Sequence, residues 1–324
     1  MTFRFLNETL PQGNGRWGEG APSQLWRYNL HYFDDLNAFD AEDRHRWHVE
    51  AIAKWIRDNP PGRGDAWAPY PTSLRVVNWI KRTLGGGGLE ERAVHSLAIQ
   101  VRSLSRRLEY HLLGNHLFVN AKALVFAGLF FEGEEAEFWL EKGMRILARE
   151  MPEQILADGG QFERSPMYHA LALEDVLDLI NLASAFSGGV PEKWRAFVGS
   201  WPAIAQRMRA WLSTMCHPDG EIAFFNDAAI GIAPSPAELE RYASELVGAQ
   251  DMAIAGATEG GGEAGASLRV LHLVESGYVR ADAPDAALLI DVAPVGPDYL
   301  PGHAHADTLS FELSLFGQRV IVNG

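Results

Sequence analysis

Two histidines and an aspartate alternate near the end of the chain, in the sequence GHAHADTLSFEL at residues 302–313. Alternate residues of a β-strand point to the same face, so His303, His305 and Asp307 are predicted to share one side of a strand. A carboxylate can orient a ring nitrogen of histidine, so the triplet could combine an acid–base group with a metal ligand. The alternative is a set of polar residues on a solvated strand face.

Two further segments place polar side chains at the start of predicted helices. In LEYHLLGNHLFVN, Asn115 and His116 follow Gly114. The amide could hold a substrate carboxylate, or it could cap the helix beside a core histidine. In DGGQFERSPMYH, Tyr168 lies close to Arg164. A nearby arginine could stabilise a phenolate that acts as a base, whereas the alternative is an anchoring tyrosine.

A helix predicted in PYPTSLRVVNWIK and the residues after it presents a polar and aromatic face with helical spacing. Aromatic rings beside hydrogen-bonding groups suit a sugar, because the ring stacks while the polar groups bind hydroxyl and carboxylate groups. Packing between helices is the alternative for most of these aromatics. The predicted substrate-binding residues are Arg75, Asn78, Trp79, Glu163 and Arg164.

Composition excludes several classes of protein. The formal net charge of -14 argues against a nucleic-acid partner, which would require a broad basic surface. Cys216 is the only cysteine, so an intrachain disulfide and a multi-thiolate metal site are excluded. The first residues lack the apolar stretch of a secretory signal, and no segment approaches the length of a membrane span, although the compartment stays open.

Helical periodicity dominates from about residue 38 to 250. Leu140, Met144, Leu147 and Met151, for example, recur on one helical face. Successive helices joined by short turns predict a helical toroid or array over residues 1–255. The helix over residues 194–215 is expected to break at Pro202.

A different pattern begins after residues 256–266, GATEGGGEAGA, which are mostly small and are predicted to form a linker. The period changes to two in VESGYVRA, AALLIDVA, TLSFELSLF and QRVIVN, which predicts strands with a hairpin turn at Phe316-Gly317-Gln318. The fold class is therefore α+β, with a β-domain over residues 267–324. Four short strands are too few for a closed sandwich, so this domain is expected to be incomplete, with QRVIVN at an uncovered edge.

Five segments together resemble the heparinase II/III-like polysaccharide lyases: LWRYNLHYFDDL, PYPTSLRVVNWIK, GNHLFVNAKAL, DGGQFERSPMYH and GHAHADTLSFELSLFGQRVIVNG. They span the chain from about residue 25 to 324. The resemblance implies an incomplete α/α toroid followed by the start of an antiparallel β-sandwich. It also implies cleavage of a uronate-containing polysaccharide, such as a heparan-type chain or alginate, by β-elimination.

The resemblance further assigns roles to individual residues. Asn115 would neutralise the uronate carboxylate, His116 and Tyr168 would transfer protons at C5 and at the leaving oxygen, and His303 would line the cleft wall. These four residues are predicted to converge on one cleft. No cofactor is required for this reaction.

A structural zinc or another divalent metal is found in some members of this family. The resemblance places His305 at the position of the metal-site histidine, and Asn323 where some members have an aspartate ligand. A neutral amide is a poorer ligand for zinc than a carboxylate.

Two other functions stay open at this point. A hydrolase of uronic-acid glycans would need two facing carboxylates, for which Glu163, Asp219 and Asp227 are candidates, although the two aspartates fit turns better. A non-catalytic protein that binds or assembles glycans could keep the same toroid. The expected partner in every case is an acidic polysaccharide or oligosaccharide, and the oligomeric state is open.

Overall fold

The structure is a computed structural model that describes residues 2–11, 15–248, 257–260 and 268–323. Its internal contacts divide the chain into two compact units. The first ends at Leu147 and the second begins at Ala148, so the division falls inside helix α6 (Glu134–Gln154). Each unit is described by itself.

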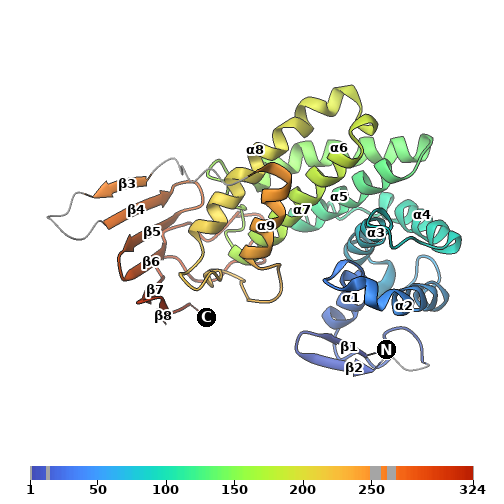
Figure 1. Ribbon diagram of the computed structural model, residues 1–324, viewed down its shortest axis with the longest axis horizontal. Helices are drawn as coiled ribbons and strands as arrows, with labels where there is room; N and C mark the ends of the chain where they lie inside the picture. The colour runs from blue at the N-terminus through green and yellow to red at the C-terminus, as the bar shows by residue number, and fades with distance from the viewer. Residues whose placement is uncertain (1, 12–14, 249–256, 261–267, 324) are drawn as a thin grey trace. The chain divides into compact units, whose positions relative to one another are not determined.

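The first unit consists of a two-stranded hairpin and a series of helices (Figure 1). The hairpin, which the sequence pattern did not indicate, pairs its strands in antiparallel register. Short 3-10 turns separate some of the helices. The elements are β1 (Thr2–Phe5), β2 (Glu8–Pro11), α1 (Gln24–Tyr32), η1 (Asp34–Asn37), η2 (Ala41–Arg44), α2 (His45–Asp58), η3 (Asp65–Trp67), α3 (Pro69–Leu84), α4 (Glu91–Ser105), α5 (Gly114–Phe130) and the first part of α6.

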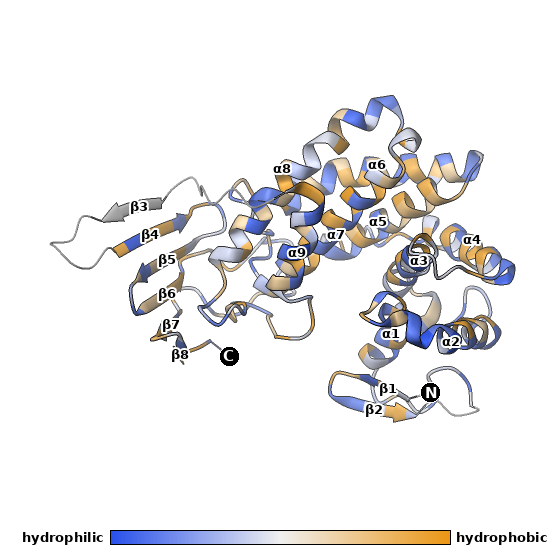
Figure 2. Ribbon diagram, in the orientation of Figure 1, coloured by the Kyte–Doolittle hydropathy of each residue, from blue (hydrophilic) through white to orange (hydrophobic). Residues whose placement is uncertain are grey.

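Local sequence explains where these helices begin and end. Ser23 caps α1, because its side chain accepts a hydrogen bond from the backbone N–H of Trp26 at 3.1 Å. Pro69 occupies the first position of α3, and the helix ends at Gly85, the first of four consecutive glycines in the sequence. Helix α5 is apolar on nearly all sides (Figure 2) and is therefore buried along most of its length. This burial holds the first turn of α5 in a fixed position.

The second unit combines three more helices with a six-stranded sheet. All neighbouring strands are antiparallel and follow one another in chain order, so the sheet is a simple meander (Figure 1). The elements are α7 (Pro166–Ala185), η4 (Ser187–Gly189), α8 (Glu192–Thr214), α9 (Pro236–Val247), β3 (Ala257–Gly260), β4 (Leu268–Leu273), β5 (Tyr278–Ala283), β6 (Ala286–Asp291), β7 (Phe311–Leu315) and β8 (Gln318–Ile321).

The four predicted strands correspond to β5, β6, β7 and β8, and the predicted hairpin turn is confirmed. Phe316 and Gly317 both have positive φ angles, of 52° and 78°, as a tight turn between twisted strands requires. Strands β3 and β4 were not predicted. Strand β8 is the last strand of the sheet among the described residues, as expected, and Val320 on it is 59% exposed.

The helices and the sheet of the second unit share a hydrophobic core. The end of α8 contributes Trp211, its C-cap residue is Met215, the following loop contributes Phe225, and the sheet contributes Tyr278 and Leu289. All five side chains are fully buried. Helix and sheet are thus packed together, although the sequence pattern changes between them.

The boundaries of 1–255 and 267–324 stay predictions. Within the predicted linker, residues 257–260 form β3 and pair with β4, and the rest of the segment lies outside the described residues. A search of the described residues finds no helix that is both long enough and apolar enough to cross a membrane.

Candidate functional site

Helix α7 positions Tyr168 in its first turn. Ser165 is the N-cap residue, and its hydroxyl accepts a hydrogen bond from the backbone N–H of Tyr168 at 3.2 Å. The same hydroxyl donates to the backbone carbonyl of Asp227 at 2.6 Å. Ser165 therefore links the start of α7 to the loop that carries Asp227.

His303 lies directly against Tyr168. The ring centroids are 3.8 Å apart, with an angle of 34° between the ring planes. The Nδ1 atom of His303 is 3.0 Å from Oδ2 of Asp227, and its Nε2 atom is 3.8 Å from Oε2 of Glu163. The imidazole thus has a phenol against its ring and a carboxylate near each nitrogen, and 25% of the His303 side chain is exposed.

The segment around His303 is not a strand, which corrects the prediction that His303, His305 and Asp307 share a strand face. Residues 302–310 form turns and loop, and β7 begins only at Phe311. Asp307 is buried, and its carboxylate accepts a hydrogen bond from the backbone N–H of Asn226 at 2.5 Å. The carboxylate that contacts His303 therefore comes from a different part of the chain.

That carboxylate belongs to Asp227, which lies in a bend of the chain and whose side chain contacts His303. For Asp219 the turn-forming interpretation holds, because its carboxylate accepts from the backbone N–H of Glu221 at 3.0 Å. Asp219 also forms an ion pair with Arg319 at 2.7 Å. Its carboxylate is therefore already engaged by these two partners.

Asn226 joins the three segments of this cluster, and the sequence analysis did not single it out. Its side-chain amide donates to the carbonyl of Arg164 and to the hydroxyl of Tyr278, each at 3.2 Å. Its side-chain oxygen accepts from the backbone N–H of His305 at 3.1 Å. Asn226 has a φ angle of 57°, a backbone conformation that asparagine tolerates better than most residues. The Asn-Asp pair at residues 226–227 could therefore have indicated a turn that brings polar side chains together.

Tyr168 is held as a neutral phenol. Burial raises the pKa of Tyr168 well above its usual value, and the negative charges of Asp227 and Glu163 raise it further. Arg164 does not counteract this, because its Nε atom donates to the backbone carbonyl of Ser276 at 3.1 Å. The predictions that Arg164 favours a phenolate and binds substrate are therefore not supported by its position.

A second polar cluster lies in the first unit, at the start of α5. The N-cap residue is Leu113, with a φ angle of 58° and no side-chain cap, so Asn115 does not cap this helix. Asn115 is partly exposed, and its side-chain amide forms no hydrogen bond with any described residue. The amide is therefore available to an external group.

His116 contacts a carboxylate that the sequence analysis did not identify. Its Nδ1 atom is 3.4 Å from Oε1 of Glu109, and its ring lies 4.5 Å from that of Tyr70. Glu109 is buried, and the side-chain amide of Asn120 donates to its other carboxylate oxygen at 3.0 Å. His116 is partly exposed rather than a core histidine.

The predicted sugar-binding face of α3 is mostly core. Arg75 and Trp79 are fully buried, and the Arg75 guanidinium lies 4.0 Å from the ring centroid of Trp55 and donates to Gln100 at 2.7 Å. Neither side chain can reach a sugar, so these two predictions are wrong. The Asn78 amide donates to Asp34 at 2.7 Å, which ties α3 to the turn after α1. The helical pattern here reflected packing between helices.

The residues proposed for a metal are His305 and Asn323. Among the described residues, no three His, Cys, Asp or Glu side chains are grouped so that they could hold a metal ion. His305 is exposed, and Asn323 uses its backbone N–H to donate to buried Glu312 at 3.1 Å. The metal-site roles of His305 and Asn323 therefore stay predictions.

A helical region followed by an antiparallel sheet is the arrangement of proteins that join an α/α toroid to a β-sandwich. Two solved structures share this fold. A heparinase III structure matches with a TM-score of 0.63 at 18% identity, over 92% of this chain and 49% of the other. A heparan sulfate lyase HepC mutant from Pedobacter heparinus matches with a TM-score of 0.59 at 20% identity, over 99% and 53%.

The chain belongs to the heparinase II/III family. The model of the heparinase II/III N-terminus matches residues 23–244, and the heparinase II/III-like C-terminal model matches residues 266–324. A heparin-sulfate lyase of Bacteroides stercoris is 30% identical over 143 residues, which cover 43% of this chain and 19% of the relative. One from Bacteroides thetaiotaomicron is 39% identical over 148 residues, which cover 42% and 21%. The chain spans about half the length of the solved structures.

Proposed function

We propose that this chain belongs to a polysaccharide lyase that cleaves a uronate-containing polysaccharide by β-elimination. The observation that carries the proposal is the contact between a neutral Tyr168 and His303, whose Nδ1 atom is held by Asp227. This arrangement can both donate and accept a proton. The names of the relatives, which are heparin-sulfate lyases, support a heparan-type substrate.

The elimination needs three things from the protein. The uronate carboxylate must be neutralised so that the C5 proton becomes more acidic, and the free amide of Asn115 can donate a hydrogen bond to it. A base must then take the C5 proton, and an acid must protonate the oxygen at C4. The C4–O bond breaks as a double bond forms between C4 and C5, with no covalent intermediate.

The surroundings of the side chains suggest which residue acts as the acid and which acts as the base. Because the pKa of Tyr168 is raised, the phenol keeps its proton at neutral pH and is suited to protonate the leaving oxygen. A neutral histidine is the better base for the C5 proton, and His303 and His116 are the candidates. In the tautomer with the ring proton on Nδ1, His303 donates to the carboxylate of Asp227, which leaves the lone pair of that ring on Nε2.

A hydrolase is less consistent with this cluster. That reaction needs two carboxyl groups on either side of the glycosidic bond. Glu163 and Asp227 instead face the two nitrogens of the same imidazole. Their position suits the control of His303 better than direct attack on a sugar.

The test uses a panel of acidic polysaccharides that includes heparan sulfate and alginate. A lyase produces an unsaturated sugar that absorbs ultraviolet light, a hydrolase produces reducing ends without this absorbance, and a binding protein produces neither. Exchange of His303 for alanine should abolish the absorbance change. His272→Ala is the matched control, because His272 is exposed on β4 and belongs to neither cluster.

The prediction that Asn115, His116, Tyr168 and His303 act on one sugar is tested by combining variants. If Asn115→Ala and Tyr168→Phe affect the same transition state, the double variant should lose less activity than the product of the two single losses. Independent effects that multiply would count against a shared site.

A further inference from the structure

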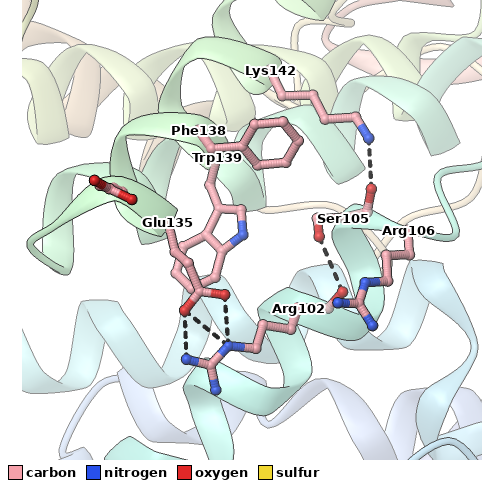
Figure 3. Close-up of a pocket in the computed structure, with 8 residues that line it drawn as sticks. Arg102, Ser105, Arg106, Glu135, Phe138, Trp139 and Lys142 are labelled. Carbon is pink, nitrogen blue, oxygen red and sulfur yellow. Dashed lines mark hydrogen bonds and ion pairs between the residues drawn. The ribbon is translucent and has the colours of Figure 1, made fainter.

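A pocket of about 570 Å³ lies in the first unit, between α4 and the start of α6 (Figure 3). It contains none of the residues of the two polar clusters described above. Its volume is within the range of sites that hold small molecules. The lining residues are Arg102, Ser105, Arg106, Glu134, Glu135, Phe138, Trp139 and Lys142.

Three cationic and two anionic side chains line this pocket, in a chain whose formal net charge is -14. Arg106 is exposed, and its guanidinium forms no hydrogen bond or ion pair with a described residue. Its donors are therefore available to a ligand. A single exposed arginine is an ordinary surface charge. Arg106 differs because two cationic side chains that line the same pocket are held in fixed positions.

Those side chains are Arg102 and Lys142. Arg102 forms a two-point ion pair with Glu135, with its Nε atom 2.9 Å from one carboxylate oxygen and 3.0 Å from the other. Lys142 donates to the backbone carbonyl of Ser105 at 2.6 Å, which orients its ammonium group and leaves further donors unused (Figure 3). Both contacts reduce the mobility of long side chains that a ligand would otherwise have to order.

An aromatic side chain completes the pocket. Phe138 is 57% exposed, and its ring lies 5.8 Å from the ammonium nitrogen of Lys142. Trp139, one residue later, is 3% exposed and packs against Phe131, so it forms a rigid wall. An exposed phenyl ring beside cations can stack on the C–H face of a sugar while the cations bind its anionic groups.

We propose that this pocket is a second binding site for an acidic oligosaccharide, separate from the catalytic residues. The class of ligand rests on the proposed function, since a lyase of acidic polysaccharides meets long anionic chains. The site would hold one part of such a chain through Arg106 and Lys142, with Phe138 against a sugar ring. Sulfate and carboxylate groups are both suitable anions for these donors.

Isothermal titration calorimetry with tetrasaccharides tests the proposal. The protein carries Tyr168→Phe, so that turnover does not consume the ligand. The probes are a heparin tetrasaccharide, a hyaluronan tetrasaccharide that has carboxylates but no sulfates, and a neutral cellotetraose. Arg106→Ala and Phe138→Ala should each weaken heparin binding at this site about five- to tenfold. Binding of hyaluronan with similar affinity would identify carboxylates as sufficient, and much weaker binding would identify sulfate as the recognised group.

Arg145→Ala is the matched control. Arg145 lies on α6, as Phe138 and Lys142 do, its side chain is 72% exposed, and it pairs with Glu141 outside the pocket. Its removal takes away the same charge and should change the affinity less than twofold. Equal effects of Arg106→Ala and Arg145→Ala, or equal affinity for cellotetraose and heparin, would overturn the proposal.

Hydrogen exchange separates this outcome from the proposed function. Heparin tetrasaccharide should slow exchange in residues 102–106 and 134–142, and Arg106→Ala should remove that protection. If protection occurs only around Tyr168 and His303, the pocket proposal fails while the lyase proposal stands. If the pocket is protected but no polysaccharide gives an unsaturated product, the lyase proposal fails while the pocket proposal stands.

Discussion

At the scale of single residues, surroundings decide the charge state of Tyr168. An arginine four residues away suggested a phenolate, but Arg164 contacts Ser276 while two carboxylates lie near the phenol. Since like charges oppose ionisation, both carboxylates favour the neutral form. The tyrosine is therefore better suited to donate a proton than to accept one from a substrate.

Tyr168→Phe should lower kcat by about a hundredfold or more, because it removes the hydroxyl group that would donate a proton to the leaving oxygen. The free energy of unfolding should change by about 1 kcal/mol or less, since the ring and its packing stay. Absorbance of the unsaturated product and urea unfolding, measured on the full-length protein, check both. Near-normal turnover by a well-folded variant would remove the hydroxyl from the mechanism.

Asp291 should make stability depend on pH. The pKa of Asp291 is raised to about 6, chiefly by burial and also by the charge of Asp307, while the backbone N–H of Ala293 and the charge of Arg164 act in the opposite direction. The folded protein therefore binds this proton more tightly than the unfolded chain does. The contribution to stability is present below the unfolded pKa and is lost as the pH rises through about 6.

Asp291→Asn removes the ionisation and keeps an oxygen that can accept from Ala293. The variant should therefore gain stability relative to the parent at pH 7.5 and gain less, or nothing, at pH 4.5. Urea unfolding at the two pH values measures the difference. A gain of the same size at both would show that Asp291 is not the titrating group.

At the scale of elements, burial overrides local signals. Pro202 was expected to break a helix, yet α8 runs from Glu192 to Thr214 with Pro202 inside it. The residues around the proline, Trp201, Ala205 and Met208, are fully buried. Their packing offsets the missing hydrogen bond, because most helical stability in proteins comes from a buried face.

The turn between β4 and β5 depends on a glycine for two reasons. Gly277 has a φ angle of 79°, and a Cβ atom there would lie 2.5 Å from the Cα atom of Ala293. Gly277→Ala should therefore lower the free energy of unfolding by more than the roughly 1–2 kcal/mol expected from the φ angle alone.

Gly317→Ala is the matched control for this effect. Gly317 has a φ angle of 78°, and a Cβ atom there would meet nothing within 4 Å. The difference between the denaturant midpoints of the two variants measures the cost of placing a Cβ atom against Ala293. Equal losses in both would mean that the segment around Ala293 simply moves.

At the scale of the whole molecule, the change of period near residue 256 does not coincide with the division between compact units. The contacts place α7, α8 and α9 with the sheet, and the division falls within α6. Trp211 of α8 and Leu289 of β6 belong to the same buried cluster. We therefore expect these helices and the sheet to unfold together.

Leu289→Ala should cost about 2–5 kcal/mol, because Leu289 is fully buried in that cluster. If the unit is cooperative, hydrogen exchange should accelerate in α8 as well as in the sheet. Val320→Ala, on the exposed edge of the same sheet, should have little effect on either. Loss of protection in the sheet alone would support a boundary at residue 255.

The sequence by itself determined the family, the helical region and strands β5 to β8, because these depend on local pattern: helical periodicity, alternation in strands, glycine turns, and motifs in a fixed order. Only the tertiary structure decided which polar residues meet. It placed Asp227 rather than Asp307 at His303, put Asn226 at the centre of the cluster, and buried Arg75 in the core. These contacts join residues far apart in the chain, and their formation depends on which groups are withdrawn from water, which local spacing does not reveal.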